Sequence, residues 1–98
     1  MWMMITYKVK PDQLEHQLAL HHEVYKALEE SQLPGLREVT FQLEDKVSFV
    51  SLIEADTMPV PGTAELEAFQ AYRVGLDDRC EEPATMRVLQ GSGSYRFS

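Results

Sequence analysis

Apolar and polar side chains alternate along residues 2–9, and this two-residue period predicts a β-strand. The same period returns at 37–44, and again at 47–55 after a short polar turn at 44–46. Two alternating runs joined by so few residues predict a β-hairpin. A fourth alternating segment, 85–97, is interrupted by a glycine-rich stretch, so we expect a strand with a bulge or bend there.

Two segments between these strands carry apolar residues at helical spacing. The first should begin near Asp12, whose carboxylate can cap free amides, and end at about Ser31. Its apolar stripe comprises Leu14, Leu18, Tyr25 and Leu28. The second should begin at Thr63 and stop before Pro83, which cannot continue a helix. Its stripe comprises Leu66, Phe69, Leu76 and Cys80. Residues 56–62 contain two prolines and read as a loop.

The order βαββαβ predicts an α+β, ferredoxin-like fold, in which a four-stranded antiparallel sheet carries two helices on one face. A chain of 98 residues is long enough for one hydrophobic core, so we expect a single domain over 1–98. The third predicted strand carries Phe49 and Ile53 on one face and Val50 and Leu52 on the other. Both faces of the sheet should therefore be covered, and we expect a homodimer that packs sheet against sheet.

Composition narrows the classes of partner. The chain is 44% hydrophobic and 26% charged, which is typical of a folded globular protein. Its net charge of -7 disfavours nucleic acid as a partner, because a polyanion would be repelled. The longest apolar run is 1–5, far below the roughly 20 residues of a membrane span. The single Cys80 excludes an intrachain disulfide and favours the reducing cytoplasm.

The whole chain resembles the dimeric α/β-barrel superfamily, particularly its small antibiotic-biosynthesis-monooxygenase-like (ABM-like) proteins. The likeness rests on the element order, the opening strand 4–9, the Pro-Gly-Leu sequence at 34–36, and the tail segments 79–83 and 93–97. It implies a ferredoxin-like subunit that pairs into a dimeric α/β barrel. It also implies a cofactor-independent monooxygenase, or a related small enzyme, acting on a hydrophobic or aromatic small molecule.

The resemblance does not extend to every branch of that superfamily. Its haem-degrading members use an asparagine on the first strand together with a tryptophan and a histidine on helical elements. This chain has no asparagine, and its only tryptophan is Trp2. Haem degradation is therefore disfavoured.

Two polar residues fall within the predicted apolar stripes and are candidates for catalysis. His21 lies among the apolar residues of the first helix, and Arg73 among those of the second. Because the two helices run antiparallel in this fold, His21 and Arg73 should lie at a similar height above the sheet. His21 could serve as a general base, and Arg73 could bind an anionic oxygen. The structural alternatives are a core histidine bonded to a neighbouring backbone or hydroxyl group, and an arginine that reaches out to Asp77.

Three aromatic residues complete the candidate site as substrate-binding groups. Tyr7 should project from the first strand toward His21, while Phe69 and Tyr72 lie on the second helix and could shape the pocket. No metal or flavin motif is visible, so no cofactor is expected; His21 and His22 in particular face different directions on a helix. The alternative function is a non-catalytic dimeric module that binds a small molecule or another protein.

Overall fold

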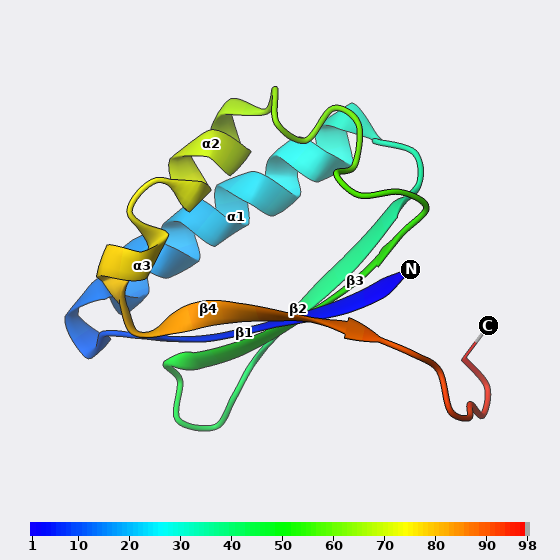
Figure 1. Ribbon diagram of the computed structural model, residues 1–98. Coiled ribbons are helices and arrows are strands. Elements are labelled where there is room, and N and C mark those ends of the chain that lie inside the picture. Colours follow the sequence, from blue (N-terminus) through cyan, green and yellow to red (C-terminus); the bar gives the residue numbers. More distant parts are fainter. Residues whose placement is uncertain (98) are drawn as a thin grey trace.

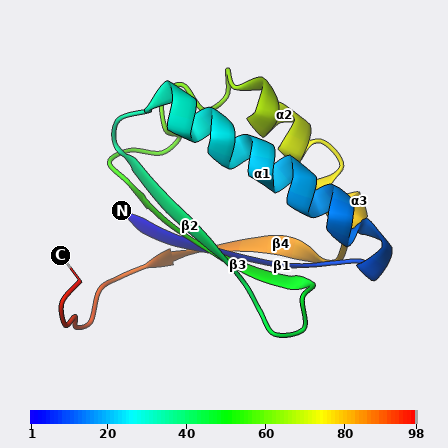
Figure 2. The same ribbon diagram turned by 180° about the vertical axis from the view of Figure 1, so that it is seen from behind.

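Four strands form one antiparallel sheet in the spatial order β2-β3-β1-β4, and all the α-helices lie over the same face of it (Figure 1). The computed structural model describes residues 1–97. Its elements are β1 (Trp2–Val9), a short 3-10 helix (Pro11–Gln13), α1 (Leu14–Ser31), β2 (Leu36–Gln42), β3 (Ser48–Ala55), α2 (Glu67–Arg73), α3 (Leu76–Arg79) and β4 (Cys80–Leu89). The view from behind shows the opposite face of the sheet without a helix (Figure 2). The predicted α+β, ferredoxin-like fold is confirmed.

The helix-facing side of the sheet forms the core. Met3 and Ile53 are buried in one apolar cluster, and Tyr7, Val9 and Phe49 in a second. The register pairs Tyr7 of β1 with Phe49 of β3, and their rings stack with centroids 5.2 Å apart. These clusters position β1 and β3, the two central strands, under the helices.

The opposite face of the sheet is also apolar. Directly paired residues share a face, and the register places Leu52 of β3 between Met4 of β1 and Val39 of β2. Phe41 opposite Val50 extends the same surface. The predicted second apolar face is therefore present, and its β2 side chains are open to solvent, with Phe41 53% exposed.

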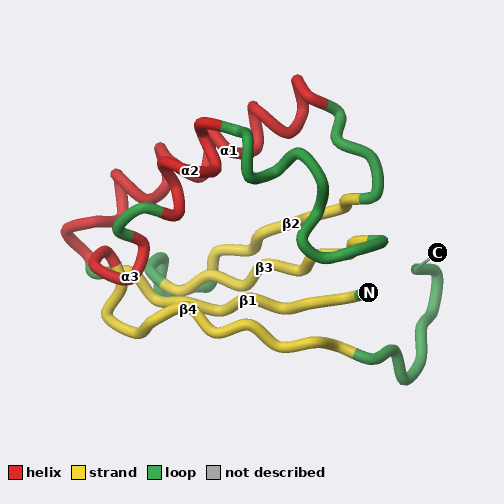
Figure 3. The backbone as a smooth tube through the Cα atoms, turned by 45° about the horizontal axis from the view of Figure 1, so that its top comes forward, coloured by secondary structure: helices red, strands yellow, loops and turns green. Residues whose placement is uncertain are grey.

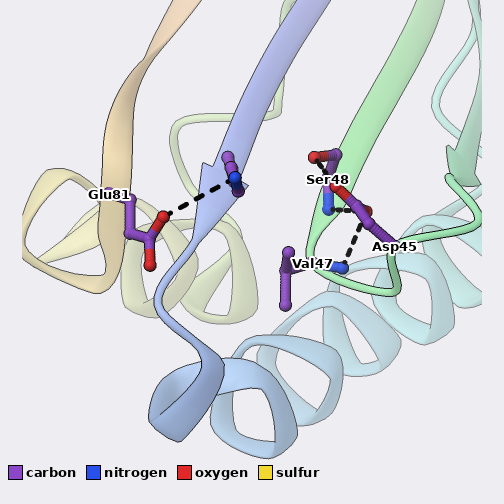
Figure 4. A network of polar contacts seen from close by, with 5 residues as sticks. Asp45, Val47, Ser48 and Glu81 are labelled. Carbon is purple, nitrogen blue, oxygen red and sulfur yellow. Dashed lines mark hydrogen bonds and ion pairs between the residues drawn. The ribbon is translucent and has the colours of Figure 1, made fainter.

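The β2–β3 hairpin has the expected polar turn, which is closed by one carboxylate. Asp45 accepts hydrogen bonds from the amides of Val47 and Ser48 at 3.1 and 2.8 Å, and from the Ser48 hydroxyl at 2.6 Å (Figure 4). These bonds hold the pKa of Asp45 below its ordinary value. Lys8 of β1 is paired with Ser48 in the register, and it forms an ion pair with the exposed Glu81 of β4 at 3.8 Å (Figure 4).

The second helical segment is shorter than predicted, because the chain turns at Gly75. This glycine adopts a φ of 75°, in the left-handed region, and separates α2 from the single turn of α3. Cys80 is consequently the first residue of β4 and not the last position of a helical stripe. Pro83 lies within β4, where it is tolerated because β4 is an edge strand. Among residues 1–97, no helix has both the length and the apolar character that crossing a bilayer requires.

Other expected boundaries also differ. Asp12 lies in the 3-10 helix and makes no capping bond to α1. Thr63 instead closes a turn by donating its hydroxyl hydrogen to the Val60 carbonyl at 2.8 Å, and α2 begins later, after Leu66.

The last strand ends at Leu89, so the segment from 90 to 97 is a loop that leaves the sheet (Figure 3). The glycines in that segment end the strand and do not form a bulge within it.

Candidate functional site

His21 points from the middle of α1 toward the sheet, as the apolar stripe predicts. Its side chain is buried, and its Nε2 lies 3.2 Å from the Oγ1 atom of Thr40 on β2. Aromatic rings surround the imidazole: Tyr25 at 4.8 Å, Tyr72 at 5.5 Å and Phe49 at 6.4 Å between ring centroids. The structure thus gives His21 the hydroxyl partner that its structural alternative requires.

Burial lowers the pKa of His21 below its ordinary value of 6.5, because the aromatic surroundings disfavour the charged form. The imidazole is therefore neutral near pH 7 and has one nitrogen able to accept a proton. Desolvation raises the pKa of the Tyr25 and Tyr72 phenols, so both remain protonated hydrogen-bond donors at neutral pH. The site combines a neutral base with neutral phenols.

A hydroxyl group on β2 joins His21 to the sheet. The Oγ1 atom of Thr40 lies 2.6 Å from the hydroxyl oxygens of both Tyr25 and Ser51. Tyr25 also donates a hydrogen bond to a carboxylate oxygen of Glu38 at 3.3 Å. Glu38 and Thr40 of β2 therefore face the helices, while Val39 and Phe41 face away from them.

Gln17 and Arg79 form a second polar cluster next to Tyr72, which the sequence did not predict. The Arg79 guanidinium is buried and donates from Nε to Gln17 at 2.8 Å, and from its other nitrogens to the carbonyl oxygens of Tyr72 and Val74. Gln17, which is fully buried, donates to the Tyr7 hydroxyl at 3.2 Å. These bonds fill the space between the helices and the sheet with protein groups.

The sequence carried one signal for this second cluster. Gln17 precedes His21 by four residues and therefore lies on the same face of α1, so its inward orientation could have been predicted. Arg79 gave no comparable signal, because its burial depends on the turn at Gly75.

The five predicted site residues are only partly brought together. Tyr72 stacks on His21, and its hydroxyl donates to that of Tyr7 at 3.2 Å, so these three residues form one cluster. Arg73 does not join them. Its side chain is exposed and lies over the ring of Phe69, with 5.8 Å from the guanidinium carbon to the ring centroid. The expectation that Arg73 points inward is wrong; Arg79 is the buried arginine of this region.

An open pocket lies beside His21, between α1 and β2. Its volume is about 270 Å³, and it is lined by Leu18, His21, His22, Tyr25, Thr40, Gln42 and Phe49. Tyr7, Phe69 and Tyr72 do not line it; Tyr72 instead contacts the His21 ring. A second pocket of about 240 Å³ includes Tyr25 and Glu38. Tyr25 lines both pockets, so the two pockets are neighbours, and the one beside His21 is called the groove below.

Neither a metal nor a reactive thiol is indicated at this site. Among residues 1–97, no group of three or more histidine, cysteine, aspartate or glutamate side chains is placed to hold a metal ion. Cys80 is buried beside Tyr7 and Val9, and burial raises the pKa of its thiol. A protonated, buried thiol is a poor nucleophile. The chemistry available here is that of His21 and its hydroxyl partners.

Comparisons with known proteins give matches in structure but not in sequence. No protein-family profile matches the chain, and no curated protein does. A solved structure named as a candidate antibiotic biosynthesis monooxygenase from Nitrosomonas europaea superposes with a TM-score of 0.73 at 19% identity, covering 92% of this chain and 88% of that one. A structure named antibiotic biosynthesis monooxygenase gives a TM-score of 0.72 at 16% identity, covering 95% and 100%.

A NIPSNAP family protein from Agrobacterium tumefaciens is similar over the same length, with a TM-score of 0.67 at 15% identity and coverage of 99% of this chain and 97% of that one. At these identities the agreement concerns the backbone and not the side chains of the site. The chain therefore has the ferredoxin-like fold of small antibiotic-biosynthesis-monooxygenase-like proteins.

Proposed function

We propose that the chain binds a small aromatic molecule in the groove beside His21 and that His21 removes a proton from it, as in a cofactor-independent monooxygenase. The observation that carries this proposal is a neutral, buried imidazole at the edge of a pocket that aromatic residues line. The pocket is close in size to the lower end of the ~300–1,000 Å³ typical of small-molecule sites. Tyr25 and Phe49 offer ring surfaces against which a planar ligand can pack.

The substrate's own electrons would drive the oxygen chemistry. Removal of a proton by His21 leaves a phenolate or carbanion that is rich enough in electrons to react with O₂. If a CH₂ group between aromatic rings is oxidised to a carbonyl, one oxygen atom stays in the product and the other leaves as water. The balance is R₂CH₂ + O₂ → R₂C=O + H₂O, with the substrate as the only reductant. The protein then needs to supply only a base and a binding surface.

The residues of the proposal differ in part from those expected. His21 is retained as the base, Tyr72 stacks on its ring, and the Tyr72 hydroxyl donates to that of Tyr7. Arg73 and Phe69 have no role at His21 in this proposal, since neither lines the pocket. Any negative charge that develops on the substrate would be met by protonated His21, which lines the pocket.

The second candidate function is a non-catalytic dimeric binding module. The observation that favours it is the filled interior: Gln17 is fully buried and Tyr7 is 5% exposed, so the groove lies at the margin of the core. A ligand in an open groove is less well shielded from water than one in a closed chamber. Binding without turnover would support this module.

We also propose that a second copy of the chain covers the open face of the sheet. The support is the apolar surface of β1, β2 and β3 that no helix covers (Figure 2). Trp2 at 40% exposure and Val39 at 44% are costly to leave in water, and pairing two identical faces would bury both copies at once. We place this dimer in the cytoplasm, where the single thiol of Cys80 would stay reduced.

Oxygen uptake with a panel of hydroxylated aromatic compounds tests the function. We expect consumption of O₂ and release of a carbonyl product with at least one compound. His21→Gln should reduce the rate by about 100-fold or more, because general-base catalysis contributes roughly 10²–10⁴. His16→Gln is the matched control, since His16 is exposed on the same helix and lies outside the pocket. Turnover that survives in His21→Gln would contradict the proposal, and binding without turnover would support the module instead.

A further inference from the structure

Three hydrogen bonds connect His21 to the carboxylate of Glu38, which lines the neighbouring pocket. They run from His21 Nε2 to Thr40 Oγ1 at 3.2 Å, from there to the Tyr25 hydroxyl at 2.6 Å, and on to Glu38 Oε1 at 3.3 Å. Ser51 adds a fourth bond, at 2.6 Å from Thr40. Each hydroxyl in this chain has one hydrogen and two lone pairs, so the direction of every bond can be deduced.

Glu38 sets the direction at Tyr25. An ionised carboxylate can only accept hydrogen bonds, so the single hydrogen of the Tyr25 hydroxyl must point at Glu38. Among residues 1–97 Glu38 takes part in no ion pair, and Tyr25 is its side-chain hydrogen-bond partner. Since the Tyr25 hydrogen is used in that bond, the contact of 2.6 Å between Tyr25 and Thr40 needs the hydrogen of Thr40.

The direction at Thr40 then fixes the protonation of His21. Once Thr40 donates to Tyr25, it has two lone pairs left and two further partners, Ser51 and His21. Both partners must donate to it. The Nε2 atom of neutral His21 therefore carries the hydrogen, and its Nδ1 atom is the unprotonated nitrogen.

The free nitrogen is also the one with access to solvent. Nδ1 of His21 makes no hydrogen bond to the protein groups of residues 1–97, and none of their fully buried side-chain nitrogens or oxygens lacks a partner. Nδ1 must therefore have some exposure, in a residue that lines the pocket.

We propose that ionised Glu38, acting through Tyr25 and Thr40, holds neutral His21 in the Nε2–H tautomer and so makes Nδ1 the base of the site. Glu38 is in this view a positioning residue, because it does not line the pocket that would hold the substrate. The inference deepens the proposed function and rests on it for its catalytic meaning. The tautomer itself is a property of the free protein and can be measured without a substrate.

Nitrogen NMR of the ¹⁵N-histidine-labelled protein reports the tautomer directly. The spectra are recorded at about pH 8, because burial raises the pKa of the Glu38 carboxyl and the proposal concerns its ionised form. The His21 signals are assigned by their loss in His21→Gln. In the parent chain we expect a proton-bearing Nε2 and an imine-like Nδ1, with no detectable Nδ1–H form. In Glu38→Lys the side chain can only donate, so Tyr25 must donate to Thr40, whose own hydrogen can then go to Ser51 or to His21. An Nδ1–H population should appear.

Glu29→Lys is the matched control, because Glu29 lines the same pocket as Glu38 and the change in charge is identical. It should leave the Nε2–H form intact. Tyr25→Phe is a second way to break the chain, and it should release the Nδ1–H form even if Glu38→Lys fails to fold. The proposal is overturned if the parent chain contains a substantial Nδ1–H form, or if folded Glu38→Lys or Tyr25→Phe protein keeps His21 wholly as Nε2–H. These spectra are recorded without substrate, so the two proposals can fail separately. An Nε2–H tautomer in a protein without turnover supports this inference and not the proposed function. Turnover in a protein with a mixed tautomer supports the proposed function and not this inference.

Discussion

The imidazole of His21 stacks on the phenol ring of Tyr72, with ring centroids 5.5 Å apart and ring planes inclined by 25°. This contact joins α1 to α2 and removes water from one side of the imidazole. Tyr25, one turn further along α1, contacts the ring at 4.8 Å. The site thereby favours uncharged His21, and that preference should be visible in the stability of the protein.

The stability of the folded chain should fall on acidification through the titration of His21. Burial gives His21 a lower pKa in the folded state than the ordinary 6.5 of an unfolded chain. As the pH falls below about 6.5, the unfolded state gains a proton that the folded state resists, so the free energy of unfolding decreases. The loss levels off below the folded-state pKa, where both states are protonated.

Urea unfolding at several pH values between about 7.5 and about 5 measures this contribution. His21→Gln cannot titrate at this position, so its free energy of unfolding should depend less on pH than that of the parent chain. His22→Gln is the matched control, because it replaces an exposed histidine of the same helix and leaves the buried His21 in place. An equal pH dependence in the parent chain and in His21→Gln would contradict the assigned shift.

The strands and the first helix could be predicted because the spacing of their apolar residues follows which side chains are buried. The period of two on β2 defines two faces, but it does not tell which of them meets the helices. We would place apolar side chains in the core, yet Val39 and Phe41 face away from the helices, and Glu38 and Thr40 face them. Thr40, which bonds to His21, and Glu38, which bonds to Tyr25, were missed for this reason.

The arginine of the second helical segment was misassigned because the segment is not one helix. A continuous helix places Arg73 on a stripe that Leu76 helps to define. The turn at Gly75 removes Leu76 from that helix, and the inward face of α2 then centres on Phe69 and Tyr72. Arg79 becomes buried only through this turn, which is a tertiary effect that a periodic pattern does not contain.

Arg79 should be far more important for stability than Arg73. Arg79→Ala removes the donors for Gln17 Oε1 and for the carbonyl oxygens of Tyr72 and Val74, and it leaves a cavity beside buried groups. We expect a loss of about 2–4 kcal/mol in the free energy of unfolding. Arg73→Ala removes only an exposed contact with Phe69 and should change it by less than about 0.5 kcal/mol.

Urea denaturation of the two variants checks this contrast, with the midpoint and the slope measured separately. Similar stabilities for Arg73→Ala and Arg79→Ala would show that the buried hydrogen bonds of Arg79 contribute little. The same experiment on Gln17→Leu is informative, since it removes the acceptor at Arg79 and the donor to Tyr7 while keeping an apolar volume. It should also destabilise the fold.

The proposed dimer predicts a specific response to charge on the open face of the sheet. Phe41→Glu places a carboxylate on the apolar face of the sheet, and its burial against a second copy would be costly. Sedimentation should show a dimer for the parent chain and a monomer for Phe41→Glu at the same concentration. Val74→Glu is the control, because Val74 is 74% exposed and lies in the α2–α3 turn, away from the sheet. A parent chain that sediments as a monomer would refute the dimer.

The substitution Gly75→Ala, which adds one methyl group, tests whether the fold requires the turn that buries Arg79. Its φ of 75° is unfavourable for residues with a Cβ atom, at a cost of roughly 1–2 kcal/mol. The space itself is available, since the nearest atom to an added Cβ is Arg79 Nη1 at 3.6 Å. Gly75→Ala should therefore lower the free energy of unfolding by about that backbone cost. Gly91→Ala is the control, because no atom lies within 4 Å of the added Cβ and φ is not positive there, so it should have little effect. Thermal unfolding measures both variants. Equal effects of the two substitutions would mean that the left-handed turn at Gly75 is not required.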